Sequence, residues 1–169
     1  MSLHPEKFRV QEVLEDVNSL TSSLASAKNI TLLFAEDSDR EVEIYADSTR
    51  IKQVMINLVN NAIKFTRNEG SVTLRVEAQT ARMLFEVRDT GIGIAADQLE
   101  YVFDEFRQAD ESTARSYGGT GLGLAIAREI VLAHHGTITA QSEPGQGSTF
   151  TVRLPLASPQ PEILPRRRK

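Results

Sequence analysis

Apolar residues spaced three or four apart predict two long helices in the first half of the chain. Between residues 10 and 28 they recur with the period of a helix that buries one face. A second helix is expected over about 48–65, because Asp47 or Ser48 can cap its first turn. Within this second helix, Leu58 and Val59 would point towards the core.

Segments in which apolar and polar residues alternate predict strands. The clearest is 71–78, where the apolar residues share one face and the polar residues the other. Five more strands are expected, at 30–35, 41–46, 83–88, 137–142 and 148–154, with a short helix at 95–101. A turn at 37–40 would join the first two, and most other neighbours are also joined by hairpins. The predicted fold is an α+β two-layer sandwich, with a mixed, mainly antiparallel sheet and helices packed on one face.

Length and composition narrow the class of protein. The 169 residues suffice for one domain with a substantial core. The net charge is −4. Without the last nine residues, the chain has 15 Lys and Arg against 22 Asp and Glu. A body this acidic argues against nucleic-acid binding. With no cysteine and no apolar run near the ~20 residues that span a bilayer, we expect a cytoplasmic monomer without direct membrane contact. The domain is expected over 8–156, between a leader or linker at 1–7 and a Pro-rich basic tail or linker at 157–169.

Six of the ten glycines lie in two short segments, and the longer segment runs from Gly118 to Gly123. It leads into a predicted helix over 124–135, which Gly136 would end in the left-handed conformation. Backbone N–H groups without obstructing Cβ atoms, at the positive end of a helix, form an anion site that most often takes phosphate. No lysine follows the last glycine and no strand leads directly into the segment, so it matches neither a P-loop nor a dinucleotide fingerprint.

The second glycine segment begins at Asp89, which ends a predicted strand and precedes Gly91, Gly93 and Ile94. A carboxylate only accepts hydrogen bonds, so at the edge of a pocket it would pair with the exocyclic amino group of adenine. The carbonyl oxygen of guanine would leave two acceptors facing each other, which is costly in a desolvated pocket. The alternative is a turn residue that bonds only to its own backbone.

Asn57, Asn61 and Lys64 share one face of the second predicted helix, since four and then three residues separate them. Two carboxamides and an ammonium in line suit a magnesium triphosphate, because Mg²⁺ usually takes only one or two ligands from protein. Asn60 is turned about 60° from Asn57 and belongs less clearly to this face. The alternative is a polar helix face that is simply solvated.

Taken in order, these segments resemble the N, G1, F and G2 boxes of sensor histidine kinases, in the GHKL superfamily. The boxes run from Asn57 to Lys64, from Asp89 to Ile94, from Phe103 to Phe106 and from Gly119 to Leu124. The segment from Gly145 to Phe150 is similar to the last glycine turn of the family. An aromatic pair such as Phe103 and Phe106 alone would more often be core, and 104–118 is expected to be a lid over the nucleotide.

The resemblance implies a Bergerat fold that binds Mg–ATP. It implies that Asn61 is a magnesium ligand, that Asn57 and Lys64 lie near the phosphates, and that Asp89 contacts the adenine amino group. The other ATP contacts that it implies are Gly91, Gly93, Ile94, Phe106, Gly119, Thr120, Gly121, Leu122, Gly123, Leu124 and Thr149.

Asn57 stands where gyrase-like ATPases of this superfamily carry a glutamate that activates water. Because an amide cannot be a general base, the site is expected to hold ATP for in-line attack by another group. The resemblance implies that this group is a histidine of a separate dimerisation and phosphoacceptor domain. A response regulator receiver domain would be an indirect partner. None of His4, His134 and His135 lies in a motif of the phosphoacceptor kind. The alternatives are a stand-alone GHKL ATPase, a serine kinase of the anti-sigma kind, and a nucleotide-gated interaction module.

Overall fold

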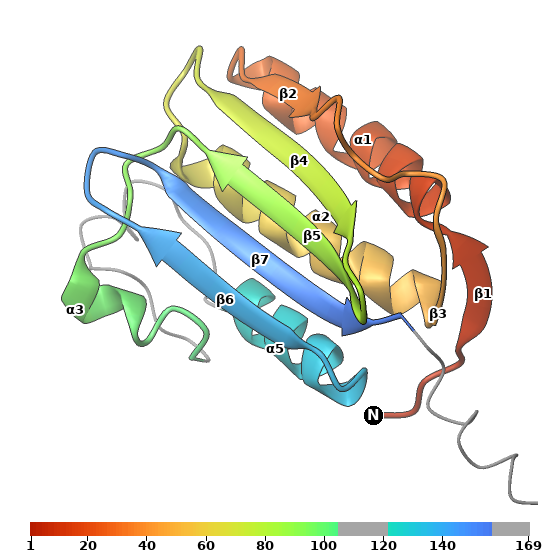
Figure 1. Ribbon diagram of the computed structural model, residues 1–169. Coiled ribbons are helices and arrows are strands. Elements are labelled where there is room, and N and C mark those ends of the chain that lie inside the picture. The colour runs from red at the N-terminus through yellow and green to blue at the C-terminus, as the bar shows by residue number, and fades with distance from the viewer. Residues whose placement is uncertain (105–121, 157–169) are drawn as a thin grey trace, which may run out of the picture.

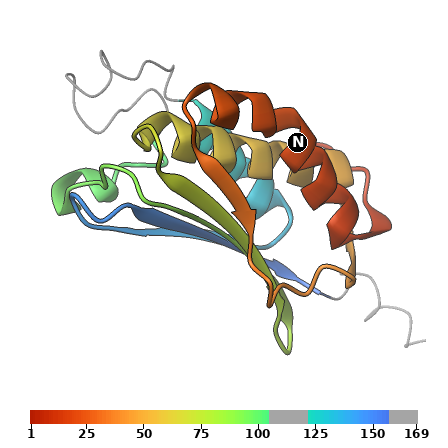
Figure 2. The same ribbon diagram turned by 90° about the horizontal axis from the view of Figure 1, so that it is seen from above.

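Three long helices of the described residues pack on one face of a five-stranded sheet (Figures 1 and 2). The structure is a computed structural model that describes residues 1–104 and 122–156. The helices are α1 (Val10–Ala27), α2 (Ser48–Phe65) and α5 (Gly123–Ala133). Of the two candidate caps for α2, Asp47 takes the role, because its side chain accepts the Arg50 N–H. In the described residues, no helix is both long and apolar enough to span a bilayer.

The sheet is mixed and mainly antiparallel, which confirms the predicted fold class. Its strand order is β2-β4-β5-β7-β6, and only β2 and β4 run parallel. The strands are β2 (Thr31–Phe34), β4 (Ser71–Ala78), β5 (Arg82–Asp89), β6 (Thr137–Ser142) and β7 (Ser148–Pro155). The core lies between sheet and helices, where apolar side chains of β4, β5 and β7 meet the buried faces of α1, α2 and α5.

The expected hairpin around 37–40 was wrong. Strand β3 (Glu43–Ala46) leaves the main sheet and pairs antiparallel with β1 (Glu6–Arg9) in a separate two-stranded sheet. The two strands on either side of the turn therefore belong to different sheets. Regular pairing begins at Glu6, inside the segment that was expected to be a leader.

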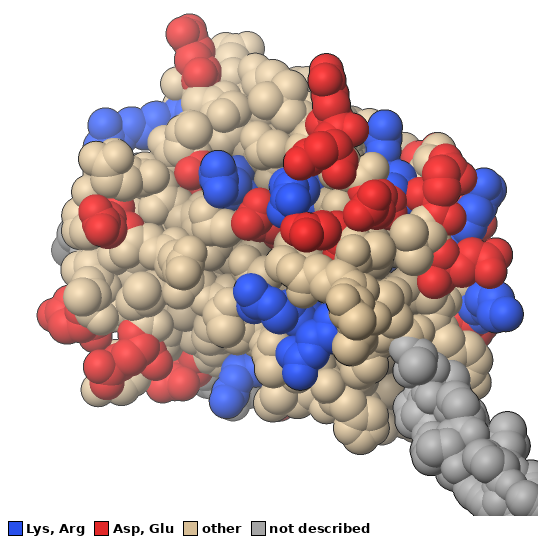
Figure 3. Space-filling view, in the orientation of Figure 1, with Lys and Arg blue, Asp and Glu red and all other residues tan. Residues whose placement is uncertain are grey.

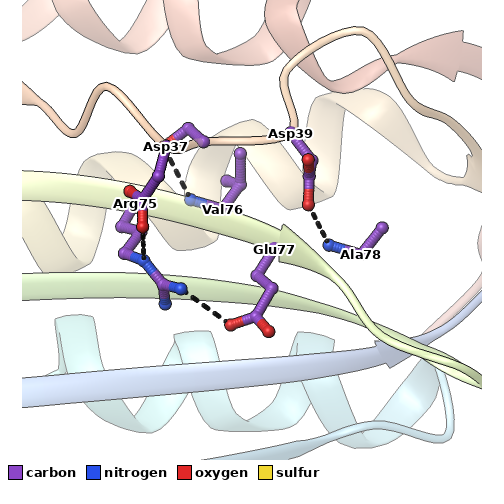
Figure 4. A network of polar contacts seen from close by, with 7 residues as sticks. Asp37, Asp39, Arg75, Val76, Glu77 and Ala78 are labelled. Carbon is purple, nitrogen blue, oxygen red and sulfur yellow. Dashed lines mark hydrogen bonds and ion pairs between the residues drawn. The ribbon is translucent and has the colours of Figure 1, made fainter.

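The segment between β2 and β3 continues along the edge of β4 after β2 has ended (Figure 4). Asp39 donates its N–H to the Val76 carbonyl at 3.0 Å, and the Val76 N–H is satisfied by Ser38 Oγ at 3.2 Å. The Ala78 N–H bonds to the Asp39 carboxylate at 2.9 Å. Polar side chains thus take the place of a strand, which satisfies the β4 backbone and blocks its edge against further pairing.

The sheet face away from the helices is polar and carries charges of both signs (Figure 3). Strand alternation places on this face the side chains of Arg75, Glu77, Glu86, Arg88 and Arg153. Because acidic and basic groups are interspersed there, the described part of this face lacks the continuous basic stripe of a nucleic-acid surface.

One end of the molecule gathers the segments that the sequence marked as functional. Strand β5 ends and β7 begins at the left end of the sheet in Figure 1, where α2 also ends. The short helix α3 (Ala96–Leu99) lies at the same end and is three residues shorter than the predicted helix at 95–101.

Candidate functional site

Asp89 is a buried carboxylate at the end of β5, with 5% of its surface exposed. Its Oδ1 accepts two backbone N–H groups, from Gly91 at 2.8 Å and from Ser148 at 3.2 Å. Within the described residues both bonds go to Oδ1, so Oδ2 keeps its capacity to accept from a ligand. Burial raises the pKa of Asp89 above its usual range, and the two N–H groups offset this only in part.

The turn after Asp89 presses against the end of α2. A Cβ atom at Gly91 would collide with the carbonyl oxygen of Phe65 and lie 2.9 Å from Asp89 Oδ1. The Ile92 N–H donates to the same Phe65 carbonyl at 3.1 Å. Glycine is required at position 91 because the backbone of the turn has to approach both the helix end and the carboxylate.

The turn also interlocks with the glycine turn that precedes β7. Gly93 has a φ of +76°, and a Cβ there would run into the Glu143 carbonyl. The Gly145 N–H donates to the Ile92 carbonyl at 2.7 Å, and the Ile94 N–H donates to Ser142 Oγ at 2.8 Å. Two segments some fifty residues apart in sequence thus form one wall beside Asp89.

The second half of helix α2 carries Asn57, Asn61 and Lys64, all half-buried. Asn57 Nδ2 donates to the Gly123 carbonyl at 3.0 Å, so α5 begins against α2 and the Asn57 Oδ1 is left as an acceptor. Lys64 Nζ lies 5.9 Å from the centroid of the Phe65 ring. The nearby Asn60 Oδ1 is buried and has no hydrogen-bond partner among the described residues.

The donor set of α2 fits magnesium better than a transition metal. Among the described residues no group of three or more His, Cys, Asp or Glu could hold a metal ion. Mg²⁺ needs no such cage, because phosphate and water supply most of its oxygen ligands. The carboxamide oxygens of Asn61 and Asn57 can supply one or two oxygen ligands.

Lys28 supports the end of α2 and was not identified from the sequence. It follows α1, and its Nζ donates to the carbonyls of Ile63 at 2.9 Å and Lys64 at 3.1 Å. A cation at these last carbonyls stabilises the negative end of the helix dipole. Burial lowers the pKa of Lys28. No local sequence signal reveals this contact, because it joins the ends of two different helices.

The structure brings Ser148, rather than Thr149, to Asp89. Asp89 and Ser148 are paired between β5 and β7, and both side chains point to the helix-facing side of the sheet. Thr149 is the next residue along the strand, so its side chain lies on the opposite face. Strand alternation next to the buried Phe150 was the signal that could have identified Ser148.

The segment that is expected to bind phosphate is described only in part. Phe106, Gly119, Thr120 and Gly121 lie outside the described residues, as do the lid contacts expected of 105–118. Leu122 caps α5, and Gly123 and Leu124 form its first turn beside Asn57. Phe103, the other aromatic residue of the pair, packs edge-on against Phe150 with ring centroids 5.9 Å apart.

His134, which follows the last residue of α5, holds the end of this helix to the N-terminus of α2. Its Nε2 accepts the Asp47 N–H at 3.0 Å, and its Nδ1 lies 2.9 Å from the Ile130 carbonyl. Asp47 in turn accepts N–H groups of His4 and Arg50. Burial alone would raise the pKa of Asp47, but these N–H bonds and the neighbouring charge of Arg50 hold it below its usual range.

Comparison with known proteins identifies the class to which this arrangement belongs. Residues 46–158 match the family described as histidine kinase-, DNA gyrase B- and HSP90-like ATPase. The nucleotide-free catalytic domain of the histidine kinase ThkA superposes with a TM-score of 0.80 at 30% identity, covering 92% of this chain and all of that domain. Full-length ShkA in complex with AMPPNP superposes with a TM-score of 0.82 at 34% identity, over 94% of this chain and 32% of ShkA.

Two curated relatives are histidine kinases that are much longer than this chain. The circadian input-output histidine kinase CikA of Synechococcus elongatus is 39% identical over 91% of this chain and 21% of its own length. The sensor histidine kinase RcsC of Escherichia coli is 38% identical over 95% of this chain and 17% of its own length. The chain therefore belongs to the ATP-binding catalytic domains of the histidine kinase family, and it spans about a fifth of these relatives.

Proposed function

We propose that this chain holds Mg–ATP for transfer of the γ-phosphoryl group to a histidine of a separate dimerisation and phosphoacceptor domain. The observation that carries the proposal is the Asp89 carboxylate, with one oxygen bonded to two N–H groups and the other left to accept. It lies at the end of the molecule where α2 ends, and Asn57, Asn61 and Lys64 lie in the second half of that helix. Base recognition and phosphate binding are then the two halves of one site.

At the base end, Asp89 Oδ2 would accept from the adenine amino group. Gly91 and Gly93 would let the backbone form a flat wall, and Ile94, packed against the core, would give it an apolar part. The buried carboxylate excludes guanine, whose carbonyl would oppose it with no hydrogen between the two oxygens.

At the phosphate end, Asn61 would be the principal magnesium ligand and Lys64 would neutralise phosphate charge. When bound, the ion supplies charge neutralisation between the phosphate oxygens. Asn57 would orient its Oδ1 towards the same region, since its Nδ2 is committed to Gly123. The remaining proposed contacts, from Gly119 through Leu124 and at Phe106, would close over the phosphates.

Hydrolysis is not what this site favours. Asn57 cannot take a proton from water, and among the described residues no carboxylate takes its place on that face of α2. Positioning and charge neutralisation are most of the catalysis of phosphoryl transfer, so a nucleophile brought by another domain can complete the site. A structure of ThkA with the response regulator TrrA supports a receiver domain as the indirect partner. We further propose that the domain acts as a cytoplasmic monomer unit, without nucleic-acid or membrane contacts of its own.

The proposal predicts tight nucleotide discrimination together with slow turnover. Calorimetric titration should give magnesium-dependent binding of ATP and at least 10-fold weaker binding of GTP, the cost of about one unpaired buried acceptor. The same preparation should release phosphate from ATP slowly in the absence of an acceptor domain. Rapid steady-state release would favour the stand-alone ATPase. Equal binding of ATP and GTP would contradict the role of Asp89.

A further inference from the structure

Ser142, the last residue of β6, makes three contacts through one hydroxyl group. Its Oγ accepts the Ile94 N–H at 2.8 Å and donates to the Gly147 carbonyl at 2.9 Å. It also lies 2.8 Å from Ser148 Oγ. Ser142 therefore joins the turn after Asp89, the glycine turn before β7, and the hydroxyl group nearest to Asp89 in the register of the sheet.

Hydrogen counting decides which serine donates in the contact between the two hydroxyls. A hydroxyl has one hydrogen, and a carbonyl can only accept. When Ser142 donates to Gly147, Ser148 has to donate to Ser142, and all three contacts are hydrogen bonds. In the opposite arrangement Ser142 Oγ and the Gly147 oxygen would lie 2.9 Å apart with no hydrogen between them, and one bond would be lost.

This arrangement determines what Ser148 offers to a ligand. Ser148 is buried, pairs with Asp89 across β5 and β7, and donates its own N–H to Asp89 Oδ1. With its hydroxyl hydrogen committed to Ser142, Ser148 Oγ has only lone pairs left. The Asp89 carboxylate likewise only accepts, so the two neighbouring side chains present acceptors alone.

We propose that Ser142 is a specificity-determining residue, which makes Ser148 an acceptor so that this part of the site takes an exocyclic amino group and rejects a carbonyl. The inference rests on the proposed function, because it assumes that the base of ATP binds beside Asp89. Ser142 acts through Ser148 and is a positioning residue. Without Ser142, the Ser148 hydroxyl can rotate and donate to a carbonyl oxygen.

Binding of ADP and IDP tests this proposal. The base of ADP has an amino group at the six-position and an acceptor at N1, whereas the base of IDP has a carbonyl at the six-position and a hydrogen on N1. Comparison of single and double variants isolates the part of their discrimination that depends on the Ser148 hydroxyl. The wild-type chain should prefer ADP. Ser142→Ala should lower the ratio of ADP to IDP affinity about tenfold, the value of roughly one hydrogen bond. In a Ser148→Ala background, adding Ser142→Ala should leave the ratio within about twofold, since no hydroxyl is left to rotate. Ser142→Thr, which keeps the hydroxyl, should retain the wild-type ratio.

The outcomes separate this inference from the proposed function. If the wild-type chain binds neither nucleotide or does not prefer ADP, both fail. If the wild type prefers ADP but Ser142→Ala leaves the ratio unchanged, the inference alone is overturned. It is also overturned if Ser142→Ala lowers the ratio equally in the Ser148→Ala background. Should Ser142→Ala not fold, Ser142→Cys, whose thiol is a weak donor and acceptor, should give an intermediate ratio, and an unchanged ratio there again overturns it.

Discussion

Replacing Asp89 with Asn is expected to weaken ADP binding roughly 10- to 100-fold, the range for a hydrogen bond to a charged group. The substitution keeps the shape of the side chain, and the Asn oxygen can still accept the N–H groups of Gly91 and Ser148. The atom in the place of Oδ2 then becomes an NH₂ group, which opposes the amino group of adenine donor to donor. Calorimetric titration with ADP measures the loss.

The same substitution should leave the fold as stable as before, or more stable, at neutral pH. Burial raises the pKa of Asp89, so the folded state binds this proton more readily than the unfolded state. The buried, charged carboxylate therefore destabilises the folded state fully when the pH is above the pKa of Asp89 in the folded state. This destabilisation disappears as the pH falls below the pKa of Asp89 in the unfolded state. In thermal unfolding, the melting temperature of Asp89→Asn should be at least that of the wild type at neutral pH, and any excess should become smaller as the pH falls. Asp97→Asn, at an exposed carboxylate, is the matched control. Unchanged ADP affinity would remove Asp89 from the base site.

Replacing Asn61 with Ala is expected to remove the magnesium-dependent part of nucleotide binding and to slow phosphoryl transfer on the order of 100-fold. A lost oxygen ligand weakens the hold on the ion without touching the base end of the site. Binding of ADP in the presence of a chelator should therefore remain close to wild type, whereas the gain from added Mg²⁺ should disappear.

Asn60→Ala provides a neighbouring control on the same helix. Asn60 is turned away from Asn57 and Asn61, and its buried Oδ1 has no partner in the described part of the chain. Its removal should leave the magnesium dependence intact. If Asn61→Ala and Asn60→Ala respond alike, or if Asn61→Ala keeps its magnesium dependence, Asn61 is not the ligand.

Local patterns predicted the elements of this fold well but not all of their partners. Each helix and the strand β4 can be predicted from the spacing of apolar residues within one segment of the chain. The structure places α1, α2, α5 and β4 close to their predicted ranges. The pairing of β3 with β1 depends on residues almost forty positions apart, so the turn at 37–40 suggested a hairpin that does not form. At the end of α5, His135 takes the left-handed position with a φ of +63°. Gly136 is needed instead because a Cβ there would collide with the Arg153 carbonyl.

In the candidate site, too, residues within one segment were predicted, whereas contacts between distant segments were missed. Asp89, Gly91 and Gly93 lie in one short segment, so their common place beside the end of α2 was predictable from their order and type. Ser148 and Lys28 were missed because their roles depend on contacts across the sheet and between helices. Thr149, a predicted ATP contact, directly follows Ser148, and one residue along a strand moves a side chain to the other face.

Phosphorylation of a histidine is the most direct test of the proposed function. A chimera of the histidine kinase CikA, in which this chain replaces the segment that it matches, would bring an acceptor histidine and the nucleotide site together at high effective concentration. With γ-labelled ATP and Mg²⁺, the proposal predicts acid-labile label on the acceptor histidine, and far less label in the same chimera with Asn61→Ala. A chimera that binds ATP yet stays unlabelled on histidine, under conditions in which unaltered CikA is labelled, would contradict the proposal.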